Sequence, residues 1–270
     1  MAVFQAACVQ MRSGATRAPN LAAATGLIEK AAAAGAQFVA TPEMTNIIEK
    51  NAKRLFAEIV AEEEAEELDA FRAQAEARKI WLLIGSLALK AGEGRAVNRG
   101  FLIGPDGAIA ARYDKMHIFD VDLPGGESYR ESAVYDAGDC AVVAKTPLAN
   151  FGLSICYDLR FPALYRRLAQ EGADVLCAPA AFTKQTGEAH WEVLLRARAI
   201  ETGSFVVAPA QGGHHEDGRD TYGHSLIIGP WGQILGRLDH DEPGVLLADI
   251  DTDQSADARA RIPNLKLERI

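Results

Sequence analysis

The 270-residue chain is long enough to bury a full hydrophobic core, and its composition, 49% hydrophobic and 24% charged, is ordinary for a globular protein. Its formal net charge of −9 argues against nucleic acid or an anionic membrane as a partner, because phosphates are bound by clustered Lys and Arg. We expect a cytoplasmic protein, since no basic-then-apolar leader opens the sequence and no apolar run approaches the ~18 residues of a membrane helix.

Strand and helix patterns alternate along the first third of the chain. Asn20 is expected to cap the first helix and Gly35 to end it. The acidic segment 58–67 is expected to form a solvated helix face. The predicted elements are, in chain order, a strand at 3–9, a helix at 20–34, a strand at 37–40, a helix at 57–78 and a strand at 81–85.

Hairpin signals appear after residue 100. The turn 104–107, Gly-Pro-Asp-Gly, lies between two apolar runs and indicates a hairpin. Gly172 is expected to end a later helix. The predicted elements are strands at 101–103, 109–113, 141–145 and 151–155, a helix at 161–171, a strand at 174–178, a helix at 189–202, and strands at 205–209, 225–228, 233–238 and 245–249.

The order of these elements predicts an α/β fold. Neither an internal repeat nor a low-complexity linker interrupts the chain, so residues 1–270 are expected to form a single domain. A mixture of hairpins and helix-linked strands implies a mixed sheet, or two sheets with helices outside. Three-layer and four-layer arrangements both remain open at this point.

The cysteines are sparse and show no CxxC spacing, which is typical of an intracellular protein with reduced thiols. Three of them, Cys8, Cys140 and Cys177, are expected to be core filler. Cys156 differs because it follows a strand and opens a helix, and a helix N-terminus favours the thiolate.

Three polar side chains follow predicted strands. Glu43 comes after the strand at 37–40, Lys115 after the hairpin, and Cys156 after the strand at 151–155. Each alone has a structural explanation, as a surface carboxylate, a solvated lysine or a buried thiol. Because ligands collect at the carboxyl ends of strands in α/β sheets, the three together predict one crevice.

The segments around these residues resemble the nitrilase superfamily of carbon–nitrogen hydrolases. Pro42-Glu43-Met44, Asp114-Lys115-Met116-His117 and Ile155-Cys156-Tyr157-Asp158-Leu159-Arg160-Phe161-Pro162 match its Glu, Lys and Cys signatures in order. The resemblance covers essentially the whole chain. It implies a four-layer α-β-β-α sandwich, usually a homodimer, that works without a cofactor. Further matches lie at 97–98, 129–132, 189–192, 196–201, 222–225 and 230–232.

The resemblance, together with the chemistry of the side chains, assigns a role to each residue. Cys156 is expected to be the nucleophile and Glu43 the base, which we expect to be poorly hydrated because a carboxylate is a weak base unless an apolar pocket raises its pKa. Lys115 and the backbone N–H of Tyr157 are expected to stabilise the oxyanion. The resemblance implies that Glu131 positions Lys115 and the substrate. No ligand cluster of zinc spacing accompanies this set, so we predict no metal.

Within the superfamily, segments 187–202, 210–215 and 222–225 are most similar to the deaminated glutathione amidases. The implied reaction splits the 2-oxo analogue of glutathione into 2-oxoglutarate and cysteinylglycine. This substrate carries several carboxylates, so its pocket needs cations or amide donors. One departure is Glu188 after Gly187, where this branch has proline. The candidate substrate-binding residues are Tyr157, Arg130, Lys184, His214, His215 and Arg219.

Other functions remain open. Within the class, the alternatives are an omega-amidase acting on 2-oxoglutaramate, another small aliphatic amide or carbamoyl hydrolase, and a true nitrilase. A catalytically silent binding protein would keep the fold but have no amide turnover. A Cys–His hydrolase of the papain type would use a histidine as its base, with His190 the residue to test.

Overall fold

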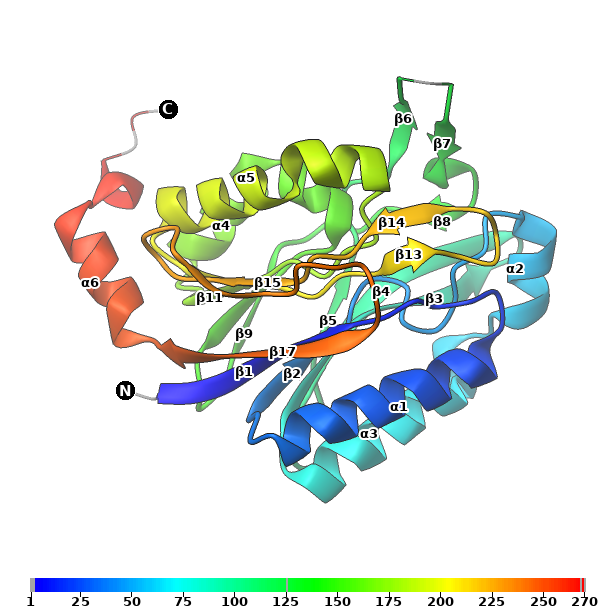
Figure 1. The fold of residues 1–270 in the computed structure, drawn as a ribbon, viewed down its shortest axis with the longest axis horizontal. Coiled ribbons are helices and arrows are strands. Elements are labelled where there is room, and N and C mark those ends of the chain that lie inside the picture. The colour runs from blue at the N-terminus through cyan, green and yellow to red at the C-terminus, as the bar shows by residue number, and fades with distance from the viewer. Residues whose placement is uncertain (1–2, 125, 268, 270) are drawn as a thin grey trace.

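Two β-sheets pack face to face, and helices cover the outer face of each, as the computed structural model in Figure 1 shows. The structure describes residues 3–124, 126–267 and 269. Helices α1 (Arg17–Ala33) and α3 (Glu66–Arg78) lie on one outer face, and α4 (Pro162–Gln170) and α5 (Lys184–Thr202) on the other. The prediction of a four-layer α-β-β-α sandwich is therefore confirmed.

The first sheet contains the N-terminal half of the chain and the last strand. Its order is β17-β1-β2-β3-β4-β5, with β8 paired to β4. Strands β1, β2 and β3 are parallel, and β3, β4 and β5 then alternate in direction, so β2 and β5 both end at the same edge. The strands are β1 (Val3–Gln10), β2 (Phe38–Ala40), β3 (Trp81–Gly92), β4 (Arg95–Ile103), β5 (Ile109–Asp114), β8 (Tyr135–Asp136) and β17 (Gly244–Asp251).

The second sheet has the order β16-β15-β12-β11-β10-β9, with β10, β11 and β12 parallel. Two hairpins lie outside both sheets, β6 with β7 and β13 with β14, and the first projects from the body in Figure 1. The bounds are β6 (Asp120–Asp122), β7 (Ser128–Arg130), β9 (Val142–Lys145), β10 (Asn150–Leu153), β11 (Val175–Cys177), β12 (Phe205–Ala208), β13 (Gly212–His214), β14 (Asp220–Tyr222), β15 (Leu226–Ile228) and β16 (Ile234–Arg237), with helices α2 (Ala52–Glu58) and α6 (Asp253–Arg261).

Strand β1 is apolar on both faces because its side chains alternate between two buried clusters. Phe4 and Cys8 point between the sheets, whereas Val9 packs in the separate cluster under α1 and α3. Between the sheets, the rings of Phe38 and Phe151 stack at 4.3 Å. A strand covered on both faces reads as a continuous apolar run, which is why β1 and β2 were visible in the sequence.

The predicted helix at 57–78 is wrong in one respect, because the chain is interrupted there. After α2, a 3-10 turn (Glu62–Glu64) precedes α3. Two glutamates of the acidic segment turn inward rather than to solvent. Glu62 accepts hydrogen bonds from Arg99 at 2.8 Å and from Arg112 at 2.7 Å. Glu67 is 2% exposed and accepts from Arg17 Nε at 3.0 Å.

Asn20 does not cap α1, which begins at Arg17 after Thr16. Its side-chain amide instead fastens a loop, since it donates to the carbonyls of Gly14 and Asn46 at 2.9 and 2.8 Å. Within the described part of the chain, no helix has both the length and the apolar character needed to span a membrane.

Candidate active site

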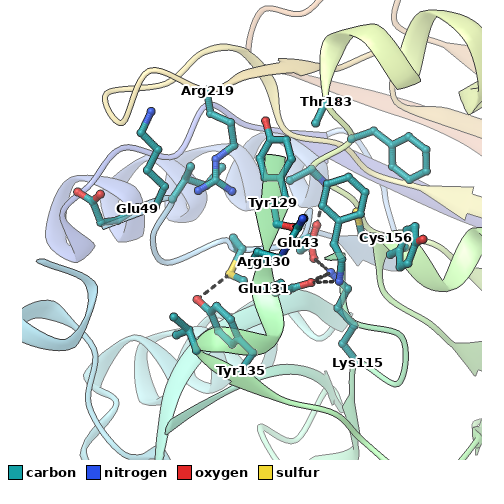
Figure 2. A pocket seen from close by; sticks show the side chains of 18 of the residues that line it. Glu43, Glu49, Lys115, Tyr129, Arg130, Glu131, Tyr135, Cys156, Thr183 and Arg219 are labelled. Carbon is teal, nitrogen blue, oxygen red and sulfur yellow. Dashed lines mark hydrogen bonds and ion pairs between the residues drawn. The ribbon is translucent and has the colours of Figure 1, made fainter. Parts of the chain in front are cut away.

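The turns after β2, β5 and β10 bring three predicted residues into one cavity. Glu43 and Lys115 follow strands that end at the same edge of the first sheet, and Cys156 follows β10 of the facing sheet. Their exposed fractions are 4%, 2% and 8%. The cavity holds about 420 Å³, and Glu131, on the turn after β7, also lines it (Figure 2).

The ammonium of Lys115 lies between two carboxylates. Its Nζ is 2.9 Å from Oε1 of Glu43 and 3.1 and 2.9 Å from the two oxygens of Glu131. Glu131 is itself held by the backbone N–H of Phe119 at 2.7 Å. Burial alone would lower the pKa of Lys115, but the two carboxylates raise this pKa well above its ordinary value. The site therefore contains a fixed positive charge.

Glu43 is buried, as expected, and all its contacts favour the charged form. Oε1 accepts from the amide of Asn98 at 2.9 Å, and Oε2 accepts from the backbone N–H of Ala181 at 2.9 Å. Burial would raise the pKa of Glu43, but Lys115 and the hydrogen bonds from Cys156 and Asn98 outweigh it and lower the pKa. The rise in basicity expected from an apolar pocket does not occur in the resting site.

Cys156 lies in a strained turn that presents its thiol to Glu43. Its φ of 50° is in the left-handed region, which non-glycine residues adopt at a cost of ~1–3 kcal/mol. Its backbone N–H donates to the carbonyl of Pro179 at 2.8 Å. Burial and the neighbouring carboxylate raise the pKa of the thiol well above its ordinary value, against a smaller effect of Lys115. The expected thiolate character is therefore wrong for the resting site, because a five-residue 3-10 turn (Cys156–Arg160) does not offset burial.

Asp158 connects the turn of Cys156 to the segment of Lys115. Its Oδ2 accepts from the Tyr113 hydroxyl at 2.7 Å and from the Ile155 N–H at 2.8 Å. Its Oδ1 accepts from the backbone N–H of His117 at 3.0 Å and lies 2.6 Å from the ring Nδ1. A carboxylate with four such partners fixes the relative position of two segments that come from different sheets.

Two further residues support the site and were not recognised from the sequence. Asn98 on β4 holds Glu43, and its amide also lies 3.4 Å from Glu131. Gly85 on β3 lies against the turn of Glu43, where a Cβ would approach the carbonyl oxygens of Thr41 and Pro42 to 2.2 and 2.5 Å. The only signal for Asn98 was its place in a matching motif, and an isolated glycine in a strand is the usual sign of such a close approach.

The structure places some of the predicted substrate-binding residues at the cavity and others elsewhere. Tyr157 and Arg130 line it, although Arg130 is also bound to Asp122 at 2.7 and 2.9 Å. Arg219, another of the predicted residues, lines it too, and so does Arg160.

Lys184, His214 and His215 are not among the described residues that line the cavity. His215 is buried, with Nδ1 2.8 Å from the carbonyl of Ser13. His214 is exposed, 2.9 Å from Asp220. Lys184 is the exposed first residue of α5.

Comparisons with known proteins agree with this geometry. The family model of the carbon-nitrogen hydrolases matches residues 5–260. The deaminated glutathione amidase of Synechocystis sp. is 42% identical over 270 residues, covering 98% of each chain. The omega-amidase NIT2 of Mus musculus is 34% identical over 269 residues, covering 100% of this chain and 96% of its own.

The solved structure of the C. elegans NitFhit protein has a TM-score of 0.90 and 35% identity. The comparison covers 99% of the present chain, which spans 65% of the length of the NitFhit chain. This chain therefore belongs to the carbon–nitrogen hydrolase family, within the nitrilase superfamily, and is a hydrolase of non-peptide carbon–nitrogen bonds.

Proposed function

We propose that the enzyme is a thiol amidohydrolase that cleaves deaminated glutathione into 2-oxoglutarate and cysteinylglycine through a thioester on Cys156. The observation that carries this proposal is the buried cluster of Glu43, Lys115 and Cys156 at a cavity that arginines also line. The 42% identity to a deaminated glutathione amidase supports the choice of substrate.

In the first step, the sulfur of Cys156 attacks the amide carbonyl carbon. The resting thiol is hydrogen-bonded to the ionised Glu43, which takes its proton as the S–C bond forms. The carbonyl electrons move to oxygen, where the ammonium of Lys115 and the N–H of Tyr157 stabilise the negative charge. One such donor contributes ~10²–10³-fold to the rate.

The intermediate then collapses and the C–N bond breaks. Glu43, now a carboxylic acid, gives its proton to the departing nitrogen, so cysteinylglycine leaves as a neutral amine and the acyl group stays on sulfur. Because Glu43 has returned to its ionised form, it is ready to act as a base a second time.

Hydrolysis of the thioester uses the same groups. Glu43 removes a proton from water, whose oxygen attacks the thioester carbon, and Lys115 again faces the oxyanion. When the C–S bond breaks, the proton held by Glu43 returns to the sulfur. Glu131 holds Lys115 throughout, so its carboxylate positions the ammonium rather than moving a proton.

The cavity also offers a cation for the acyl half of the substrate. Arg160 belongs to the same turn as Cys156, and its guanidinium lies 5.3 Å from the ring centre of Phe182. We propose that it binds the carboxylate of the 2-oxo acid. The same acyl group occurs in 2-oxoglutaramate, so omega-amidase action, supported by the 34% identical relative, is the second candidate.

A comparison of kcat/KM across four substrates tests the proposal: deaminated glutathione, 2-oxoglutaramate, a simple aliphatic amide and a nitrile. Deaminated glutathione is expected to give the highest value. A higher value for 2-oxoglutaramate would select the omega-amidase, and a nitrile or a neutral amide ranking first would contradict both candidates. Trapping the acyl-enzyme and locating the added mass on Cys156 would test the thioester.

We also propose that the enzyme is a cytoplasmic homodimer. Its four cysteines are free thiols, as expected in a reducing compartment. Cys140 is exposed, so the expectation that it fills the core is wrong. The outer layer carries the exposed apolar side chains of Val193 and Ile200 on α5 and of Trp231. The turn of Trp231 packs on this helix, since Arg196 donates to the carbonyl of Gly232 at 2.9 Å. Apolar groups gathered on one face support an interface between copies.

A further inference from the structure

The cavity has a second cationic end, formed by residues that the reaction does not use. Arg219, from the turn between β13 and β14, and Lys50 both line the cavity. In Figure 2, Arg219 and Glu49 lie on one side of the cavity and Cys156 on the other. Arg160, by contrast, is four residues from Cys156 and lies over Phe182. The Arg160 end of the cavity is therefore near the thiol, and the Arg219 end is farther from it.

The guanidinium of Arg219 is held in a fixed orientation. Its Nε and Nη2 donate to Oδ2 of Asp217 at 3.1 and 2.7 Å, and the side chain of Asp217 is fully buried. Among the described residues, Nη1 of Arg219 has no hydrogen-bond acceptor. An arginine fixed along one edge presents its other N–H groups to a ligand, and the planar fork of donors suits a carboxylate.

The charges around Arg219 add up to one unpaired cation. Asp217 neutralises Arg219, and Glu49 is paired with Arg54 at 2.7 Å. Lys50 remains, and its Nζ is close to the turn of Arg219, since a Cβ on Gly218 would lie 3.5 Å from it. This end of the cavity therefore has the charge to accept a single carboxylate.

The order of the reaction decides which half of the substrate lies here. The leaving amine must depart before water reaches the thioester, so it has to face the mouth of the cavity. Among the described lining residues, Lys50, Ala52, Ser128 and Arg130 are exposed, whereas Glu43, Lys115 and Cys156 are buried, so the mouth lies away from the thiol and includes Lys50. The acyl half then lies near Arg160, beside the thiol.

We propose that Arg219, aided by Lys50, is a binding site for a carboxylate on the amine side of the scissile amide. This inference rests on the proposed function and deepens it. In deaminated glutathione the group is the glycine carboxylate of cysteinylglycine. 2-Oxoglutaramate releases only ammonia and has no group that reaches Arg219, so this end of the cavity selects between the two substrates.

The test compares the two substrates, which form the same acyl-enzyme and differ only in the leaving group. The double variant Asp217→Asn/Arg219→Gln removes the guanidinium of Arg219 without leaving a buried carboxylate unpaired. It is expected to lower the ratio of kcat/KM for deaminated glutathione to that for 2-oxoglutaramate by ~10–100-fold, the range for a hydrogen bond to a charged group. Arg237→Gln removes an arginine paired with Asp239 outside the cavity and should leave the ratio unchanged.

A third substrate isolates the carboxylate itself. Deaminated glutathione with its terminal carboxylate converted to a carboxamide should be a ~10–100-fold poorer substrate for the wild type. The double variant keeps only Lys50 at this end and should distinguish the carboxamide from the acid several-fold less than the wild type does. An equal loss on every substrate, or a wild type indifferent to the carboxamide, would overturn the inference while leaving the proposed function in place. If the wild type turns over neither parent substrate, both are overturned.

Discussion

The hydroxyl of Tyr113 donates a hydrogen bond of 2.7 Å to Oδ2 of Asp158. Tyr113 lies on β5 of one sheet, two residues before Lys115, and Asp158 lies two residues after Cys156, in the turn that follows β10 of the other sheet. The bond therefore joins the ends of two sheets at the point where Lys115 and Cys156 line one cavity.

Tyr113→Phe removes this bond, together with the hydrogen bond that the hydroxyl oxygen accepts from the backbone N–H of Met116. It is expected to reduce the free energy of unfolding by about 1–3 kcal/mol, because Asp158 is left with one unfilled acceptor position in the core. Urea unfolding of the variant measures the change. Tyr129→Phe is the matched control and should cost far less, since the one hydrogen bond of its hydroxyl to a described residue is the 3.4 Å contact with Glu127. Equal losses in the two variants would show that Asp158 does not depend on Tyr113.

Glu43→Gln tests the identity of the base. The amide keeps the shape of the side chain and can still accept from Lys115, but it cannot take the thiol proton. We expect kcat/KM to fall by ~10²–10⁴-fold, the usual contribution of general acid–base catalysis, with the fold retained. His190→Gln should keep most of the activity, because His190 lies beside Arg160 and outside the residues lining the cavity. The opposite pattern would favour a Cys–His mechanism.

The sequence predicts that three reactive side chains lie together, because the type of each side chain and its position after a strand can be read directly from the chain. Glu43, Lys115 and Cys156 each follow a strand, and such ends meet at one edge of a sheet. Glu131 was assigned through resemblance alone, and its two contacts with Lys115 agree with the role. Strands β1 and β2 were visible because both faces of the first sheet are covered.

Tertiary contacts that no local pattern encodes account for the rest. Glu62 and Glu67 belong to an acidic run that reads as a solvated helix, yet Arg99 and Arg17, distant in the chain, bind them and turn the segment inward. His215 lies in the segment 210–215 that resembles the deaminated glutathione amidases, but its ring is buried and bound to Ser13 and Thr221. Asn98 contacts the carboxylates of Glu43 and Glu131, and these two groups come close together only in the folded structure.

The pH dependence of kcat/KM should have its acidic limb at low pH. Glu43 must be ionised to accept the thiol proton, and its pKa is lowered from 4.5 because Lys115 and the hydrogen bonds to it outweigh burial. Activity is therefore present above that folded pKa and lost as the pH falls through it. Rates measured from pH 7 downward, with circular dichroism at each pH to exclude unfolding, should stay level to below pH 4.5. A midpoint near 6.5 would indicate a histidine instead.

His215 makes the stability of the protein depend on pH. Its Nδ1–H donates to the carbonyl of Ser13, and Nε2 accepts from Thr221 at 2.7 Å, so the neutral ring is fully satisfied. Burial lowers its pKa from 6.5 despite the bond to Ser13. The unfolded chain therefore binds a proton that the folded chain does not.

Stability is expected to be lost as the pH falls below 6.5, by at most ~1.4 kcal/mol per pH unit from this one group. His215→Gln should remove this part of the slope of unfolding free energy against pH. His214→Gln, a change at the exposed neighbouring histidine, should keep it. Parallel slopes for the wild type and His215→Gln between pH 5.5 and about 6.5 would contradict the assignment.

Ile200 tests the proposed homodimer. Its side chain is exposed on α5 against the turn of Trp231, where a Cβ on Gly232 would lie 2.6 Å from Cδ1 of Ile200. In a two-fold interface a single substitution occurs twice, so Ile200→Lys places two like charges on an apolar contact. Light scattering at micromolar concentration should give a dimer for the wild type and a monomer for this variant. Val3→Lys, at an exposed valine on β1, should remain dimeric. A monomeric wild type, or a dimer unaffected by Ile200→Lys, would place the interface elsewhere or remove it.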